Sequence, residues 1–342
     1  MTPSMLLALA LASSASAFLT GAVRRYAVAH HVLDVPNSRS SHLVATPRGG
    51  GVAIVMVSLA ALPWLADQSL LPSNVFWALA GGGALVALVG FVDDHRHVAA
   101  RWRLVAHFAS AVWAIYWLGG MPPLVFPIVG PVEGWLGSAL LAIYLVWLLN
   151  LYNFMDGIDG IASVEAISVL VGGALLYTIA GQPTLAAAPS MLAAAVAGFL
   201  YWNVPPAKIF MGDAGSGFLG IVLGVLSVQA GWIDPELFWA WQILLGVFVV
   251  DATVTLVRRL VRGERVYEAH RSHAYQHASR RFGGHLPVTL AVTVINAVWL
   301  FPIAVCVVLG LFDGTTGLLI AYLPLFAIAI RLHAGDDEPF ER

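Results

Sequence analysis

Charged residues are scarce in this chain. Its 342 residues include 17 Lys and Arg and 19 Asp and Glu, so that 11% are charged while 59% are hydrophobic. A soluble domain carries about 25% charged residues, and the composition therefore excludes an ordinary soluble protein. A single cysteine, Cys306, has no partner in the chain, which excludes an internal disulfide framework. We expect no nucleic-acid partner.

Long apolar segments recur along the whole chain. A membrane helix needs about 20 apolar residues, and the polar breaks divide this chain into eleven segments near that length. The sequence predicts an all-α, polytopic membrane protein with one transmembrane domain over residues 1–335 and a short tail over 336–342. The predicted spans are 4–22, 49–66, 75–92, 102–119, 134–152, 161–180, 185–203, 217–232, 237–257, 288–310 and 314–332.

The N-terminal segment "MLLALALASSASA" has the apolar core and small residues of a cleaved signal peptide. However, no basic residue precedes it, and apolar residues continue through "FLTGAV" to Arg24 and Arg25. A signal peptide begins with a basic region. We therefore interpret the segment as a retained first helix.

The loops on one side of the predicted bundle carry no Lys or Arg. All 17 such residues lie in the other set of loops or at the adjoining helix ends. Because basic loops face the cytoplasm, we place the N-terminus in the periplasm and the C-terminus in the cytoplasm. The cytoplasmic segments are 24–48, 93–103, 153–160, 204–216, 258–287 and the C-terminal tail, and these loops also hold the chemically distinctive motifs.

Asp93 and Asp94 stand side by side at the end of the apolar segment "LVALVGFVDDHRH". Adjacent carboxylates repel one another, and at a helix C-terminus they also oppose the helix dipole. A bound divalent cation or an approaching cationic group would offset this repulsion. The alternative is a solvated helix end without a function.

Asn153, Asp156 and Asp159 lie three residues apart in "NFMDGIDGIA", between two apolar spans. On a helix this spacing would place the three side chains on one face. Gly157 and Gly160 favour an irregular backbone, which membrane proteins tolerate where it lines a cavity. A plain cytoplasmic turn is the alternative.

Asp213 lies in the glycine-rich segment "KIFMGDAGSG", where small residues let the backbone approach a ligand closely. With the two preceding motifs it brings five aspartates to one membrane face. So many carboxylates are costly near lipid without cations, and hard oxygen ligands indicate Mg²⁺, with Mn²⁺ as the alternative. The candidate metal ligands are Asp93, Asp94, Asp156 and Asp213.

Two basic loops complete the candidate site. In "EAHRSHAYQH" we interpret His270, Arg271 and His273 as a cluster that holds phosphate oxygens. A zinc pair formed by the two histidines and a loop that anchors to anionic lipid are the alternatives. Loop 24–48 offers Arg39 and Arg48 as donors to phosphate or sugar hydroxyls.

Glu165 and Asp251 are carboxylates within or at the ends of apolar spans, where ionisable side chains are commonly functional. Asp251 lies about two turns from Arg258 and Arg259, and an ion pair with one of them would explain it. We give both carboxylates less weight than the loop motifs.

Five motifs in this order carry a resemblance that covers nearly the whole chain: "VPNSRSSHLVATPRGGG", "FVDDHRH", "NFMDGIDG", "FMGDAGS" and "AHRSHAYQ". The sequence resembles the polyprenyl-phosphate N-acetylhexosamine-1-phosphate transferases, which include the peptidoglycan lipid I synthase and the initiators of O-antigen. The resemblance implies a Mg²⁺-dependent enzyme of the bacterial inner membrane with its active site on the cytoplasmic face. Its substrates would be a UDP-sugar and undecaprenyl phosphate, and UMP would be released. The oligomeric state stays open, with a homodimer among the alternatives.

The resemblance also implies roles for individual residues. Asp213 would coordinate the metal on the diphosphate. Asp93 would deprotonate or position the acceptor phosphate, with Asp94 assisting. The resemblance places Asn153, Asp156 and Asp159 on the nucleotide side, with Asp159 at the uracil edge. Phe210 would stack on the base, and Gly212 would allow a close approach of the backbone. The residues implied to face phosphate are His270, Arg271 and His273.

Two departures from the peptidoglycan enzyme bear on the donor. That enzyme has three consecutive histidines where this chain has "AHRSHAYQ", and a lysine where this chain has Leu43. Both argue against UDP-MurNAc-pentapeptide and favour UDP-GlcNAc or a 6-deoxy relative. A secondary transporter is the alternative from another class, but it would require polar groups at the membrane midplane and two internal repeats. The motifs of CDP-alcohol phosphatidyltransferases and of prenyltransferases are not matched.

Overall fold

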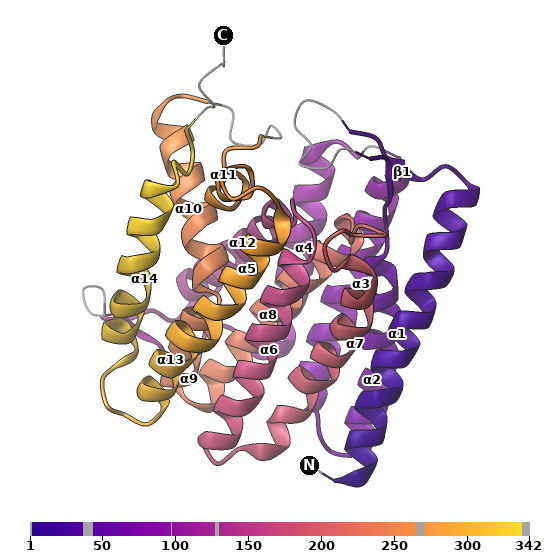
Figure 1. The fold of residues 1–342 in the computed structure, drawn as a ribbon. Helices are drawn as coiled ribbons and strands as arrows, with labels where there is room; N and C mark the ends of the chain where they lie inside the picture. Colours follow the sequence, from indigo (N-terminus) through magenta and orange to yellow (C-terminus); the bar gives the residue numbers. More distant parts are fainter. Residues whose placement is uncertain (1, 37–43, 97, 127–129, 265–269, 337–342) are drawn as a thin grey trace.

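The apolar segments of the sequence form helices that run alongside one another (Figure 1). The structure is a computed structural model that describes residues 2–36, 44–96, 98–126, 130–264 and 270–336. The helices are α1 Pro3–Ala29, α2 Gly51–Asp67, α3 Ser73–His95, α4 Ala100–Leu118, α5 Gly134–Met155, α6 Ile161–Ile179, α7 Ala187–Asn203, α8 Asp213–Ile233, α9 Pro235–Leu244, α10 Gly246–Val261, α11 Ala274–Arg281, α12 His285–Ile295, α13 Phe301–Val308 and α14 Gly314–Arg331. A 3₁₀ turn (Pro183–Ala186) precedes α7, and a π-helical turn (Asn296–Leu300) joins α12 to α13.

Short strands tie down two of the loops. β1 (Leu33–Asp34) pairs with β2 (Thr46–Pro47), and β3 (Val125–Phe126) pairs with β4 (Gly130–Pro131), both antiparallel. The chain after β2 also pairs with the loop before α8, because the backbone N–H of Phe210 donates to the carbonyl of Pro47 at 2.8 Å. This contact fixes the N-terminal loop beside the start of α8.

Eight helices in the described ranges are long and apolar enough to cross a membrane, or nine if α9 and α10 form one span. α9 and α10 meet at an angle of 70°. α2 has 17 residues, and α4 has 19 with arginines in its first turn. The prediction of an all-α, polytopic membrane protein is confirmed, whereas the count of eleven spans and the sides of the two termini stay predictions.

α8 is the central helix of the bundle. Every residue from Ala214 to Gly231 is buried, and the helix packs against α3, α5 and α9. Because neighbours surround α8 on all sides, its first residue, Asp213, has a fixed position. The C-terminal ends of α3 and α5 contact the beginning of α8. The predicted motifs meet at this point.

Candidate active site

Asp94 holds the beginning of α8. Its buried carboxylate accepts hydrogen bonds from the backbone N–H of Asp213 at 3.0 Å and of Ala214 at 3.3 Å. A negative charge at a helix N-terminus stabilises the unpaired N–H groups and the dipole there. Gly212, with φ +79°, allows this approach, because a Cβ at that position would lie 2.6 Å from the Asp94 carboxylate. The structure thus places Gly212 against Asp94.

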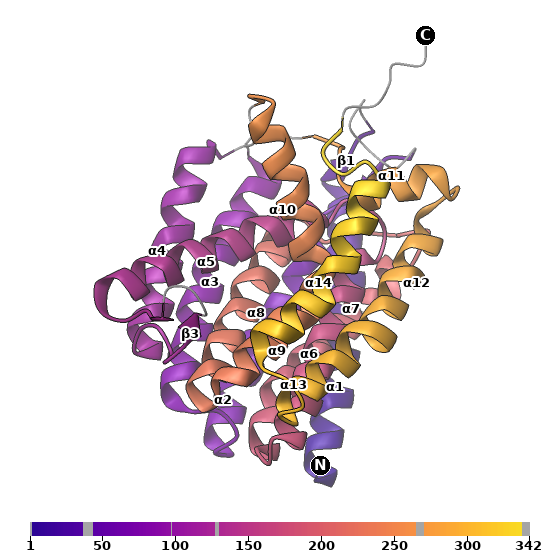
Figure 2. The same ribbon diagram turned by 90° about the vertical axis from the view of Figure 1, so that its left-hand side faces the viewer.

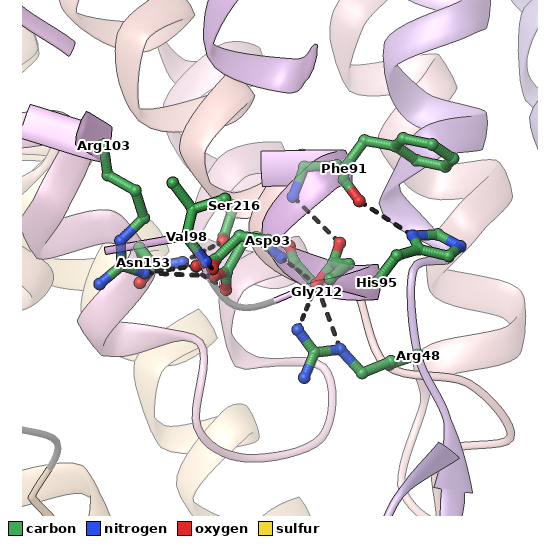
Figure 3. A network of polar contacts seen from close by, with 12 residues as sticks. Arg48, Phe91, Asp93, His95, Val98, Arg103, Asn153, Gly212 and Ser216 are labelled. Carbon is green, nitrogen blue, oxygen red and sulfur yellow. Dashed lines mark hydrogen bonds and ion pairs between the residues drawn. The ribbon is translucent and has the colours of Figure 1, made fainter. Parts of the chain in front are cut away.

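Arg48, which Figure 3 labels, neutralises the Asp94 carboxylate from the loop side. Its Nη2 lies 2.6 Å from Asp94 Oδ1, and its Nε donates to the same oxygen at 3.2 Å. Burial disfavours the charged guanidinium, but the charge and hydrogen bond of Asp94, together with the charges of Asp213 and Asp34, outweigh this effect and raise the pKa of Arg48. Asp94 therefore positions the start of α8 and is paired with Arg48.

Asp93 points to a different partner from its neighbour. Its Oδ2 lies 2.6 Å from Arg103 Nη1, and its Oδ1 accepts the backbone N–H of Val98 at 2.7 Å. The same Arg103 nitrogen lies 3.6 Å from Asp213 Oδ2. Arg103 therefore bridges two of the predicted carboxylates, and sequence reasoning did not single it out. The available signal was a basic residue in the first turn of the helix that follows the Asp93 motif.

Asn153 completes this cluster from the last turn of α5. Its side-chain amide donates to Asp213 Oδ1 at 3.0 Å and approaches Ser216 Oγ at 2.9 Å. Asp93, Arg103, Asn153 and Asp213 line one cavity of about 150 Å³, which we call the acid cavity. The structure therefore brings together three of the predicted site residues and one that was missed.

Asp156 lies just beyond the end of α5. Burial, followed by the negative charge of Asp213 and of the other nearby aspartates, raises the pKa of Asp156 well above its ordinary value. Negative charge is therefore concentrated at this point of the molecule. Among the described residues, no three His, Cys, Asp or Glu side chains form a ready-made metal site.

Asp159 and Phe210 line a second cavity, of about 480 Å³, which we call the loop cavity. One carboxylate oxygen of Asp159 accepts the backbone N–H of Ala207 at 3.0 Å and lies 3.2 Å from His285 Nδ1. The acid cavity and the loop cavity have no lining residue in common. The "NFMDGIDG" motif thus divides, with Asn153 in the first cavity and Asp159 in the second.

His273 is buried, and its ring nitrogen Nδ1 lies 3.3 Å from Asp251 Oδ1. Asp251 also accepts the backbone N–H groups of Ala274 and Tyr275, both at 2.9 Å, so it anchors the N-terminus of α11. The expected ion pair between Asp251 and an arginine of α10 is wrong. Those arginines instead pair with Asp336 and Glu264: Arg258 at 2.7 Å and Arg259 at 2.6 Å, respectively.

His270 stacks on His273 with ring centroids 4.8 Å apart. Burial, together with the neighbouring His273 and Arg259, lowers the pKa of His270 to about 3. A neutral imidazole offers a hydrogen bond to phosphate but no positive charge. Arg271, partly exposed beside it, is the charged member of the predicted cluster. Arg39, the other predicted phosphate donor, lies outside the described residues.

Tyr275 ties α11 to the end of α5. Its hydroxyl donates to the backbone carbonyl of Phe154 at 3.1 Å. Gly157 lies directly against that hydroxyl, and a Cβ at this position would overlap it. The loop after α5 and the helix that follows His273 are therefore packed as one unit.

Comparison with known proteins matches residues 76–231 to the family described as "Glycosyl transferase family 4". The matched segment contains both the acid cavity's aspartates and the "NFMDGIDG" motif. This part of the chain is thus similar to glycosyl transferase family 4. Arg48 and the His270–His273 segment lie outside the matched residues, and the structure joins them to the site through Asp94 and through Tyr275.

Curated proteins are similar to this chain over most of its length. A "Probable undecaprenyl-phosphate N-acetylglucosaminyl 1-phosphate transferase" of Bacillus subtilis is 27% identical over 82% of this chain and 79% of its own length. An "Undecaprenyl-phosphate alpha-N-acetylglucosaminyl 1-phosphate transferase" of Thermotoga maritima is 28% identical over 78% of this chain and 80% of its own. A "Decaprenyl-phosphate N-acetylglucosaminephosphotransferase" of Mycolicibacterium smegmatis is 27% identical over 71% of this chain and 65% of its own.

Proposed function

We propose that this protein transfers N-acetylhexosamine-1-phosphate from a UDP-linked donor to undecaprenyl phosphate. The products are UMP and undecaprenyl-diphosphate-N-acetylhexosamine, the first intermediate of a lipid-linked glycan. The convergence of Asp93, Arg103, Asn153 and Asp213 in one cavity at the helix ends is the observation that carries the proposal. The names of the similar curated proteins support the same lipid acceptor and transferred group.

The two cavities suit the two parts of such a reaction. The loop cavity, with an aromatic ring at Phe210 and a carboxylate at Asp159, offers stacking and hydrogen bonding to a nucleotide base. The acid cavity offers paired carboxylates and the guanidinium of Arg103, which can bind and orient the reacting phosphates. Asp156, at the turn between Asn153 and Asp159, lies beside the connecting diphosphate in this arrangement.

The chain's own residues divide the work of transfer. Arg103 neutralises developing negative charge on phosphoryl oxygens, an effect that preorganised donors exert most strongly in a site sheltered from water. Asn153 orients the Asp213 carboxylate through its 3.0 Å hydrogen bond. The acceptor phosphate is itself a nucleophile near neutral pH, so Asp93 is required to position it rather than to act as a strong base.

The oxygen donors of the acid cavity fit Mg²⁺, with Mn²⁺ as the alternative. Mg²⁺ is commonly held by one or two carboxylates together with substrate phosphates and water, so a ready-made cluster of three protein ligands is not required. Asp213, which is partly exposed, and Asp93 would hold the ion, while Asp156 lies within its electrostatic reach. When bound, the ion would neutralise the donor diphosphate.

We place the enzyme in the bacterial inner membrane with both cavities on the cytoplasmic side. The location of all Lys and Arg in the predicted cytoplasmic loops supports this orientation. The motif departures in the sequence favour UDP-GlcNAc or a 6-deoxy relative over UDP-MurNAc-pentapeptide, as for an initiator of O-antigen.

The test is a transfer assay with purified protein. The protein is incubated with undecaprenyl phosphate, Mg²⁺ and a panel of UDP-N-acetylhexosamines, and UMP and the lipid diphosphate are measured by liquid chromatography and mass spectrometry. We expect equimolar formation of both products with at least one donor, and none with Asp213→Asn or with EDTA. The protein used must be monodisperse and must show a thermal unfolding transition. If such protein releases no UMP with any donor, the result would contradict the proposal and favour the transporter hypothesis.

A further inference from the structure

An apolar groove lies apart from the acid cavity and adjoins the loop cavity at Pro287. This groove, of about 420 Å³, runs between α10, α11, α12 and α14, the helices grouped on one side of the bundle in Figure 2. Its walls are mostly apolar, with Val250, Val288, Val292, Ile328 and Ala329 among the lining residues. Its charged lining residues are Asp251, which is bonded to His273, and two arginines. The volume is within the range of sites that bind small apolar ligands.

Two arginines stand at this groove. Arg281 is in the last turn of α11, and Arg331 is the last residue of α14. Both are exposed, and neither forms an ion pair with a carboxylate of the described chain, although Arg281 lies over the ring of Phe282 at 6.0 Å. By contrast, Arg262 at the end of α10 pairs with Glu264 at 2.6 Å. Within the described residues, the groove therefore combines an apolar interior with two arginines that no carboxylate pairs with.

A neighbouring groove shows that apolar surface alone does not produce this combination. It lies between α10 and α14, has a volume of about 630 Å³ and is also mostly apolar. Its single arginine, Arg258, is bound to Asp336 at 2.7 Å and to the carbonyl of Ala334. Among the described lining residues of that groove, the one arginine is paired, so charge complementarity to an anion distinguishes the first groove from the second.

The first groove is also separate from the acid cavity, with which it shares no lining residue. Its inner wall is the back of α11, formed by Ala274, Tyr275 and Ala278. The N-terminus of that helix is anchored by Asp251, and the Tyr275 hydroxyl reaches across to Phe154. A molecule in the groove would therefore pack against α11 on the side that faces away from the acid cavity, and it would not contact Asp213.

We propose that this groove binds an anionic phospholipid of the surrounding membrane. One acyl chain fills the apolar groove, and the headgroup phosphate is held by Arg281 and Arg331, because arginine binds phosphate through paired hydrogen bonds. Basic pockets between membrane helices on the cytoplasmic side recognise anionic headgroups in this way. The bound lipid stabilises the position of α11 and hence of His273.

The proposal is tested by lipid binding, which does not depend on turnover. Detergent-purified protein is mixed with equal amounts of phosphatidylglycerol and phosphatidylcholine of identical chains, and bound lipids are counted by native mass spectrometry. Three variants are compared with the wild type. The double variant Arg281→Gln/Arg331→Gln removes both arginines of the groove, and Ala291→Trp fills the groove from the exposed side of α12. The control is Arg25→Gln, which replaces an exposed arginine near the end of α1.

We expect wild type and Arg25→Gln to retain phosphatidylglycerol in at least fivefold preference. The double variant should lose that preference but still bind lipid, and Ala291→Trp should lose the tightly bound lipid. Retained preference in the double variant would overturn the proposal, and so would an equal loss in Arg25→Gln. Displacement of phosphatidylglycerol by equimolar undecaprenyl phosphate would also overturn it, because the groove would then belong to the acceptor substrate.

Discussion

The carboxylate of Asp94 accepts the backbone N–H of Asp213 at 3.0 Å, so one aspartate of the site fixes the position of another. Asp93, its neighbour in sequence, instead contacts Arg103 in the acid cavity. Two adjacent and chemically identical side chains therefore have different roles. One stabilises the helix that carries Asp213, and the other is available to the reacting groups.

This division predicts that Asp94→Asn acts mainly on stability. The change weakens charged hydrogen bonds to Arg48 and to the α8 N-terminus, and such bonds contribute roughly 1.5–3 kcal/mol each. We expect a clearly lower thermal midpoint for Asp94→Asn, measured by intrinsic fluorescence in a fixed detergent. Asp93→Asn, the matched control, should lose transfer activity with a smaller change in midpoint, because its bonds to Val98 and Arg103 hold the start of α4, which is less buried than α8. The opposite pattern, with Asp93→Asn the less stable variant, would contradict the assignment.

Arg103 should be as important to transfer as the aspartates it bridges. Removing one preorganised electrostatic donor commonly lowers kcat by roughly 10²–10³, and we expect a loss of this order for Arg103→Gln. Arg101→Gln, two residues earlier on the same helix and exposed, is the control and should stay within about twofold of wild type. The measurement is the rate of UMP release at saturating substrates. A kcat for Arg103→Gln close to that of Arg101→Gln would remove Arg103 from the site.

The contact between Gly157 and Tyr275 predicts a rescue. Gly157→Ala adds a methyl group that overlaps the Tyr275 hydroxyl, so the variant should displace α11 from the end of α5 and lose activity at least tenfold. Tyr275→Phe removes the hydroxyl and its hydrogen bond to Phe154, and alone it should cost less. In the double variant the overlap with the hydroxyl is gone, so activity should rise above that of Gly157→Ala. The recovery should be partial, because the ring carbon that bore the hydroxyl would still lie 3.1 Å from the new methyl group. Simple addition of the two losses would argue against this contact.

His270 should make stability depend on pH. Burial and its neighbours lower the pKa of His270 to about 3, whereas an unfolded histidine titrates near 6.5. Between these values the unfolded chain binds the proton and the folded chain does not, so this contribution to stability is complete above pH 6.5 and is lost as the pH falls. We expect the thermal midpoint to drop less between pH 7 and pH 5 in His270→Gln than in wild type. His333→Gln, with a side chain 70% exposed, is the control. An unchanged drop in His270→Gln would refute the low pKa.

Much of the arrangement follows from local sequence. Long apolar segments predicted the helices, and the motifs at their ends predicted that Asp93, Asn153 and Asp213 would meet. The sequence also pointed to His273 as part of the site, although it misassigned the partner of Asp251. The spacing of about two helical turns suggested an arginine of α10 as the partner of Asp251. In the structure the buried side chain of His273 is its partner instead.

The sequence by itself determined that this is a helical membrane protein with its polar chemistry gathered at helix ends, because the cost of placing charge in lipid acts on each segment separately. Only the tertiary structure decided what each carboxylate does. Asp94 and the backbone of Asp213 are 119 residues apart in the chain, and Asp159 turns toward Ala207 and away from the acid cavity. Such choices depend on which helix ends pack together and on the direction of each side chain, and neither is set by local pattern.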